Sequence, residues 1–219
     1  MKRTLIAVLA INVILSPTAF ADSKSRASKA VKVAVLKCAA TKATGHAPKD
    51  VAPAQKLPKK LPQTFTFDTN CGNIVVTTVG ARAPITITQL ATLAKGGYFD
   101  NSLCHRLTTQ GLYVLQCGDP TATGSGGPNF SYRDENLPQS TEANYPAGVV
   151  AMANSGANTN GSQFFIVYED TSLPPSYTIW GKVTQGLDIV QSIAKEGVVG
   201  GKSDGLPKRT IAIEKVKVR

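Results

Sequence analysis

The chain has 219 residues, of which 42% are hydrophobic and 17% charged, so it can form one globular domain with an ordinary core. Its formal net charge is +10 at pH 7, yet residues 62–219 carry twelve Lys and Arg against twelve Asp and Glu. Because the basic excess lies wholly in residues 1–61, the composition argues against a folded nucleic-acid-binding surface.

The first residues have the layout of a secretory signal peptide. Lys2 and Arg3 give a positive start, an almost wholly apolar run follows to Leu15, and Ala19 and Ala21 supply small residues at an expected cleavage point. The apolar run is short for a membrane span, so an uncleaved anchor is the weaker alternative. We therefore expect residues 1–21 to direct the protein out of the cytoplasm, to a secreted or extracytoplasmic location.

Residues 22–61 are rich in Lys, Ala and Pro. They hold ten Lys and Arg but two Asp, and Pro48, Pro53 and Pro58 interrupt any regular element. This composition predicts a mobile, disordered linker whose positive charges repel one another. The functional alternative is attraction to acidic polymers or lipid headgroups of the cell envelope.

The pattern over residues 62–219 predicts a β-rich domain. Phe65 and Phe67 alternate with polar residues before a turn at residues 71–73, which indicates a hairpin. Short strands are also expected at residues 104–107, 112–117, 148–152, 163–167 and 177–183. In the last strand, 210–218, the apolar residues change phase midway, which predicts a bulge.

Two helices are expected in this domain. Pro84 suits the first position of one helix, which Gly96 would end. The second spans Leu187–Ala194, with Gly197 placed to end it. Many short strands with only two helices favour a closed or nearly closed antiparallel β-barrel.

The four cysteines are Cys38, Cys71, Cys104 and Cys117, and an exported chain can oxidise them. None lies in a Cys-x-x-Cys spacing, so we expect no zinc site. The pairing stays open. If Arg106 and Gln116 share one face, strand alternation places Cys104 and Cys117 on opposite faces, which favours Cys71 with Cys104.

The sequence lacks the residue patterns of most familiar catalytic sites. The domain has one histidine, His105, no Gly-x-Ser-x-Gly elbow and no obvious set of acidic metal ligands. Gly124–Gly127 is not followed by Lys-Ser or Lys-Thr, so a phosphate-binding loop is not expected. We therefore expect no metal and no cofactor. A polar and aromatic set remains, suited to binding an extended peptide: Arg106, Tyr113, Gln116, Asn154, Gln163, Phe165 and Tyr177.

Several motifs resemble the cyclophilin family of peptidyl-prolyl cis–trans isomerases, in the family's order. They are Cys104-His105-Arg106-Leu107, Leu115-Gln116-Cys117-Gly118-Asp119, Met152-Ala153-Asn154 and Asn158-Thr159-Asn160-Gly161-Ser162-Gln163-Phe164-Phe165-Ile166. The resemblance covers roughly residues 62–219, and the Asn-Gly-Ser-Gln-Phe-Phe run is highly specific. It implies a closed eight-stranded antiparallel β-barrel capped by two α-helices.

The same resemblance implies a site. Arg106 would be the principal catalytic residue, with Gln116 beside it. The implied substrate-binding residues are Tyr113, Val114, Ala153, Asn154, Ser155, Gln163, Phe165, Leu173 and Tyr177. Two extra residues separate Arg106 from Gln116 relative to the commoner family spacing, so the placement of Tyr113 is the least direct. Tyr177 stands where many members have a histidine.

The implied activity is prolyl isomerisation that accelerates the folding of exported proteins. Its partners would be proline-containing peptides and unfolded exported chains, with no nucleic acid, and we expect a monomer. The altered loop before Gln116 leaves an alternative, a catalytically weak proline-peptide-binding chaperone or adaptor. A third hypothesis is a binder of envelope polyanions that acts through residues 22–61.

Overall fold

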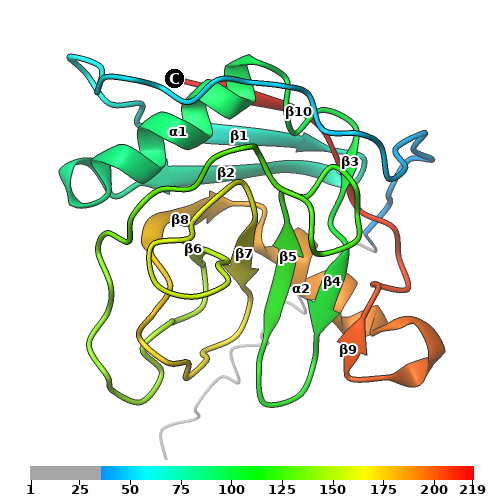
Figure 1. Cartoon of the computed structure of the whole chain (residues 1–219). Coiled ribbons are helices and arrows are strands. Elements are labelled where there is room, and N and C mark those ends of the chain that lie inside the picture. The colour runs from blue at the N-terminus through cyan, green and yellow to red at the C-terminus, as the bar shows by residue number, and fades with distance from the viewer. Residues whose placement is uncertain (1–35) are drawn as a thin grey trace, which may run out of the picture. The chain divides into compact units, whose positions relative to one another are not determined.

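One antiparallel sheet organises residues 36–219, which are the residues that the computed structural model describes (Figure 1). Its ten strands are β1 (Thr64–Thr69), β2 (Gly72–Thr78), β3 (Ser102–Leu103), β4 (Arg106–Thr108), β5 (Val114–Cys117), β6 (Val149–Met152), β7 (Phe164–Val167), β8 (Ile179–Gln185), β9 (Asp204–Gly205) and β10 (Ala212–Val218). They lie in the order β3-β10-β1-β2-β8-β6-β7-β5-β4-β9, and the sheet curls around a core. The expected signal peptide, residues 1–21, falls outside the described residues.

The two predicted helices are present as α1 (Pro84–Lys95) and α2 (Leu187–Glu196). Pro84 occupies the start of α1, as its fixed φ angle favours. Gly197 ends α2 with a φ angle of 82°, in the left-handed region that glycine adopts without steric cost. Both helices turn buried apolar side chains toward the same core.

The expected closed eight-stranded barrel is not confirmed. The sheet has ten strands, because β3 and β9 add two short pairings at the two ends of the strand order. Within residues 36–219 no ladder joins β3 to β9. Each of these strands has two residues, too few to show a period of two, and β9 pairs with β4 from far along the chain. Local patterning therefore could not predict them.

The β1–β2 hairpin and the bulge in β10 agree with the predictions. Phe67 pairs with Ile74 across the hairpin. On the other side of β1, Asp68 pairs with Lys215 but Thr69 pairs with Ile213, so one residue of β10 is left without a partner. The extra residue explains the change of phase in the apolar pattern of this strand.

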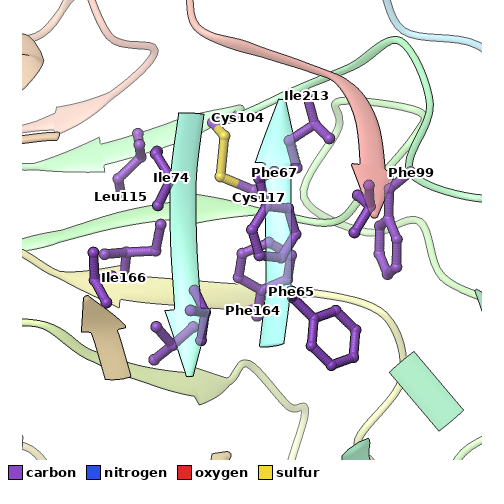
Figure 2. Packing of buried hydrophobic residues seen from close by; sticks show 14 of the residues in the cluster. Phe65, Phe67, Ile74, Phe99, Cys104, Leu115, Cys117, Phe164, Ile166 and Ile213 are labelled. Carbon is purple, nitrogen blue, oxygen red and sulfur yellow. A yellow bond between two sulfur atoms is a disulfide. The ribbon is translucent and has the colours of Figure 1, made fainter. Parts of the chain in front are cut away.

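Aromatic side chains fill the space that the curled sheet encloses (Figure 2). The ring centroids of Phe65 and Trp180 lie 5.3 Å apart, and those of Phe164 and Trp180 lie 5.9 Å apart, both edge to face. Phe164 and Phe165 point to opposite faces of β7, since side chains alternate along a strand. Phe165 belongs to a second, smaller cluster with Val114, Tyr145, Val149, Ala151 and Val167 on the other face of the sheet.

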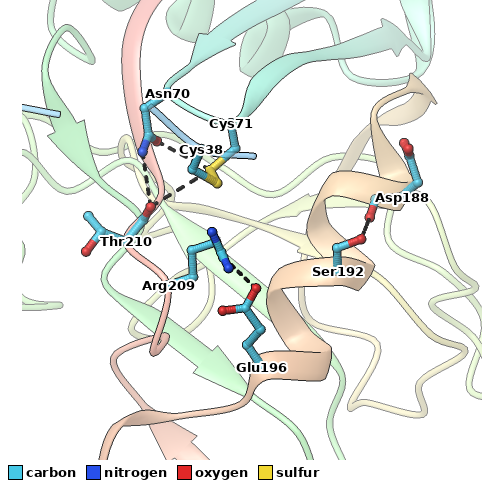
Figure 3. A network of polar contacts seen from close by, with 8 residues as sticks. All are labelled: Cys38, Asn70, Cys71, Asp188, Ser192, Glu196, Arg209 and Thr210. Atoms are coloured by element: carbon cyan, nitrogen blue, oxygen red, sulfur yellow. Dashed lines mark hydrogen bonds and ion pairs between the residues drawn. A yellow bond between two sulfur atoms is a disulfide. The ribbon is translucent and has the colours of Figure 1, made fainter. Parts of the chain in front are cut away.

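The two disulfides join Cys38 to Cys71 and Cys104 to Cys117 (Figures 2 and 3). The favoured pairing of Cys71 with Cys104 is therefore wrong. Cys104 lies between β3 and β4 and donates its backbone N–H to the carbonyl of Ile211 at 3.0 Å. Because Cys104 lies outside β4, the alternation within that strand does not fix the direction of its side chain.

Residues 36–61 have almost no regular structure but are tied to the domain. Besides the disulfide at Cys38, the N–H of Ala39 donates to the carbonyl of Asn70 at 2.7 Å. Gln89 of α1 exchanges two hydrogen bonds with the backbone of Ala54. This part of the segment thus differs from the mobile linker expected over residues 22–61, because tertiary contacts order a chain that has no period of its own. Residues 22–35 lie outside the described range.

No helix within residues 36–219 is both long enough and apolar enough to cross a membrane.

Candidate active site

Arg106 and Gln116 lie directly opposite each other on β4 and β5. Paired residues of antiparallel strands turn their side chains to the same face. The Nη1 atom of Arg106 donates to Oε1 of Gln116 at 3.1 Å, and Nε2 of Gln116 donates to Oε1 of Gln163 at 2.8 Å. The two glutamines and the arginine predicted to act together therefore form one continuous hydrogen-bonded chain.

A glycine-containing loop anchors the far end of this chain. Nε2 of Gln163 donates to the carbonyls of Gly124 and Gly126, at 3.0 and 2.8 Å. The buried carboxylate of Asp119 accepts hydrogen bonds from the backbone N–H groups of both glycines. A Cβ atom at Gly126 would lie 2.1 Å from Oδ1 of Asp119, so only glycine fits there.

Asp119 stays ionised although it is fully buried. Burial alone would raise the pKa of its carboxyl. Hydrogen bonds from the Thr121 hydroxyl and from the backbone of Gly126, Thr121 and Gly124 outweigh burial and hold the pKa below its ordinary value. The loop that positions Gln163 is thus organised around one buried negative charge.

The other edge of the Arg106 guanidinium contacts Asp204, which the sequence did not indicate. Nε donates to Oδ1 of Asp204 at 2.8 Å, and Nη2 donates to Oδ2 at 2.7 Å. This hydrogen-bonded contact raises the pKa of Arg106 and lowers that of Asp204. Asp204 stands 98 residues after Arg106, and no motif marks it.

Beside Arg106 lies a pocket of about 160 Å³. Its lining comprises Arg106, Leu112, Val114, Gln116, Ala153, Asn154, Phe165, Leu173 and Tyr177. All but Leu112 were predicted site residues. Val114 and Phe165 are almost completely buried and belong to the outer apolar cluster, so the pocket combines a hydrophobic wall with a cationic rim.

Tyr113 is a predicted site residue that lies outside this pocket. Its ring packs against Tyr168, with centroids 6.0 Å apart, beside the main core. Leu112 and Val114 line the pocket instead, because neighbouring residues on an extended chain face opposite ways. The extra residues before Gln116 leave a leucine where the resemblance implied an aromatic ring.

Ser155 and Gln163 belong to an adjoining groove of about 470 Å³. The groove runs between the loop at residues 124–131 and residues 153–155, and none of its lining side chains is charged. It shares Gln116, Ala153 and Asn154 with the pocket. Because they share these lining residues, the pocket and the groove adjoin each other.

Tyr145 supports the pocket, although the sequence analysis did not identify it. Its hydroxyl accepts from the N–H of Tyr177 and donates to the carbonyl of the same residue, both at 3.0 Å. Burial raises the pKa of Tyr145 to about 12, so this hydroxyl stays protonated. Nearby, Nδ2 of Asn154 donates to the carbonyl of Ser176 at 2.8 Å and ties down the turn before Tyr177.

Among residues 36–219 no group of three or more His, Cys, Asp and Glu side chains is arranged to hold a metal ion.

Comparison with known proteins identifies the family. The family model described as "Cyclophilin type peptidyl-prolyl cis-trans isomerase/CLD" matches residues 64–218. The chain belongs to the cyclophilin family. Two solved cyclophilin-type isomerase structures from Cryptosporidium parvum are similar in fold, both at 28% identity over 72% of this chain. The first has a TM-score of 0.61, and 98% of the solved chain is covered. The second, determined in the presence of the dipeptide Ala-Pro, has a TM-score of 0.60, and 99% of the solved chain is covered.

Two curated proteins are similar in sequence, each named "Probable peptidyl-prolyl cis-trans isomerase B". The protein from Mycobacterium leprae is 44% identical over 161 residues, and that from Mycobacterium tuberculosis 41% identical over 181 residues. These alignments cover 68% and 73% of this chain. They span 55% and 59% of the relatives, so the chain matches little more than half of their length.

Proposed function

We propose that this cyclophilin is a peptidyl-prolyl cis–trans isomerase. The observation that carries the proposal is Arg106 at the rim of a small apolar pocket walled by Val114 and Phe165. Rotation about a peptide bond meets a barrier of about 18–20 kcal/mol, because amide resonance is lost in the twisted state. A site that holds the proline ring and favours the twisted amide lowers this barrier with no cofactor and no covalent intermediate.

Arg106 would stabilise the twisted state by donating hydrogen bonds. Of the five N–H bonds of its guanidinium, Asp204 takes two and Gln116 takes one. One N–H on each of Nη1 and Nη2 is left for the substrate. Loss of resonance leaves a lone pair on the proline nitrogen, and a cationic donor placed beside it stabilises the transition state more than the planar ground state.

The remaining pocket residues would bind the substrate. Val114, Phe165, Leu173 and Tyr177 surround the proline ring, and the preceding residues of the peptide lie along Ala153, Asn154 and Ser155 in the manner of an added strand. Gln163 orients Gln116 and, through it, the arginine. A solved relative determined in the presence of Ala-Pro supports proline-containing peptides as the substrate class.

We further propose that the protein acts on exported chains outside the cytoplasm. The signal-like pattern of residues 1–21 supports export, and the two disulfides within residues 36–219 are consistent with an oxidising compartment. Prolyl isomerisation takes tens of seconds without a catalyst, which makes it a slow step in the folding of such chains.

The test is isomerisation of a proline-containing tetrapeptide by the full chain and three variants. Arg106→Ala should lower kcat/KM by about 10²–10³-fold, the effect of removing one transition-state donor. Arg106→Lys should recover little, because an ammonium group cannot make the bidentate contact. The exposed Arg133→Ala serves as the control and should match the wild type.

Equal rates near background for the wild type and Arg106→Ala would reject the isomerase. Binding of the same peptide by both proteins would then favour the alternative, a proline-peptide-binding chaperone or adaptor with little catalysis.

A further inference from the structure

Asp204 belongs to a short strand, β9, that no sequence pattern places near the site. In β9 it pairs with Thr108 of β4, two residues beyond Arg106 (Figure 1). The next backbone contact, from the N–H of Thr109 to the carbonyl of Ser203 at 2.8 Å, continues this pairing. The carboxylate of Asp204 is thus presented by a hydrogen-bonded strand rather than by an unsupported loop.

Resting on the isomerase function proposed above, we propose that Asp204 is the positioning residue that fixes the guanidinium of Arg106 for catalysis. Asp204 does not line the pocket and would not touch the substrate. It acts on Arg106 through two hydrogen bonds in the bidentate geometry that suits a planar guanidinium.

The two contacts of Arg106 hold different edges of its head group. Asp204 holds the Nε and Nη2 edge, whereas Gln116 holds Nη1 alone. A single hydrogen bond to Nη1 lets the head group pivot, and a free arginine side chain has many rotamers. With both edges held, the two unused N–H bonds point in one fixed direction, so the donor is preorganised before substrate binds.

The ion pair of Asp204 with Arg106 contributes little to the stability of the fold. The side chains of Arg106 and Asp204 are 38% and 53% exposed, and an ion pair so open to water contributes little to folding. Misplacing a catalytic group, by contrast, lowers a rate steeply. Arg106 also keeps the pKa of Asp204 below its ordinary value, so the carboxylate remains charged at the neutral pH of an isomerase assay.

The experiment compares Asp204→Asn and Asp204→Glu in the full chain, with the exposed Asp50→Asn as the matched control. We expect Asp204→Asn to lower kcat about tenfold while KM changes less than about twofold, since the substrate contacts remain and only the donor geometry is lost. Asp204→Glu keeps the charge and should recover part of the rate. The melting temperature of each variant should stay within about 3 °C of wild type, as for other surface ion pairs.

A double variant separates positioning from a general structural effect. If Asp204 acts through Arg106, then Asp204→Asn should cost nothing further in the Arg106→Ala background. An equal loss in both backgrounds would overturn the proposal. Wild-type kcat in Asp204→Asn would also overturn it, and so would a rise in kcat, which would show that the carboxylate restrains the arginine.

A measurement without turnover keeps this inference separate from the proposed function. The Nε–H proton of Arg106, observed by NMR, should exchange slowly with water in the wild type and rapidly in Asp204→Asn. Slow exchange in both would reject the anchoring by Asp204 even in an active enzyme. If the wild type proves inactive, the isomerase proposal fails while a loss of slow exchange in Asp204→Asn still establishes the anchor.

Discussion

Replacing Asp119 with Asn tests whether the glycine-containing loop positions the site. Oδ1 of Asp119 accepts from the N–H of Thr121 at 2.8 Å, and Oδ2 accepts from the N–H groups of Thr123, Gly124 and Gly126 at 3.1, 2.8 and 3.0 Å. An asparagine offers one oxygen and one NH₂ group. Whichever way the amide turns, at least one backbone N–H loses its acceptor and faces another donor.

The magnitude follows from these contacts. An orphaned buried donor costs about 1–3 kcal/mol, and the hydrogen bonds that remain lose the strengthening that the negative charge provides. Because the side chain is completely buried, we expect the free energy of unfolding to fall by about 3 kcal/mol. For a domain of this size, that loss lowers the melting temperature by about 6–12 °C.

Asp119→Asn should also lower the activity of the site. If the loop relaxes, the carbonyls of Gly124 and Gly126 no longer hold Gln163, and kcat/KM should fall about tenfold at a temperature where the variant is still folded. Thermal unfolding followed by circular dichroism measures the first effect and tetrapeptide turnover the second, with the exposed Asp50→Asn as the control. A variant that melts and turns over like the control would refute this account of the loop.

Three further predictions follow from contacts elsewhere in the fold. The carboxylate of Glu135 accepts from the N–H groups of Ile85 and Thr86, at 3.1 and 2.8 Å, in the first turn of α1. Glu135→Ala should therefore lower the free energy of unfolding by about 1–2 kcal/mol in urea denaturation, whereas a change at an exposed glutamate should not. Replacing Cys38 and Cys71 by serine should lower the free energy of unfolding by about 2–4 kcal/mol and make residues 36–61 more susceptible to limited proteolysis. Unchanged cleavage would show that the other contacts of this segment are enough to hold it. Burial lowers the pKa of His105 below 6.5, so the unfolded chain binds a proton that the folded chain does not, and stability should fall as the pH drops below about 6.5. His105→Gln should remove this part of the pH dependence, and an unchanged slope in denaturation midpoints between pH 7.5 and 5.5 would contradict it.

The elements that the sequence predicted correctly are those whose causes are local. The β1–β2 hairpin depends on alternation around a turn, and both helices depend on a period bounded by Pro84, Gly96 and Gly197. The strand count failed because β3 and β9 exist only through partners distant in sequence. The disulfide pairing failed for a related reason, since Cys104 lies outside β4 and is held by a backbone contact with Ile211 that no local pattern encodes.

The site divides in the same way. Arg106, Gln116 and Gln163 were predicted because they stand in specific motifs, and the structure brings all three together. Asp204 and Tyr145 were missed because each acts through one long-range contact and lies in no recognisable pattern. Even the misplacement of Tyr113 has a physical cause, because an insertion beside a strand changes which of two neighbouring side chains faces the pocket.

The direction of every hydrogen bond in the network is set by its two ends. The carbonyls of Gly124 and Gly126 can only accept, so the amide of Gln163 must turn its nitrogen toward them and its oxygen toward Gln116. Gln116 must then turn its own nitrogen toward Gln163 and its oxygen toward Arg106. The two neutral glutamine amides thus orient the Arg106 guanidinium relative to the glycine-containing loop without adding charge beside the substrate. The carboxylate of Asp204 contacts the opposite edge of the guanidinium, where it can hold the donor without occupying the pocket.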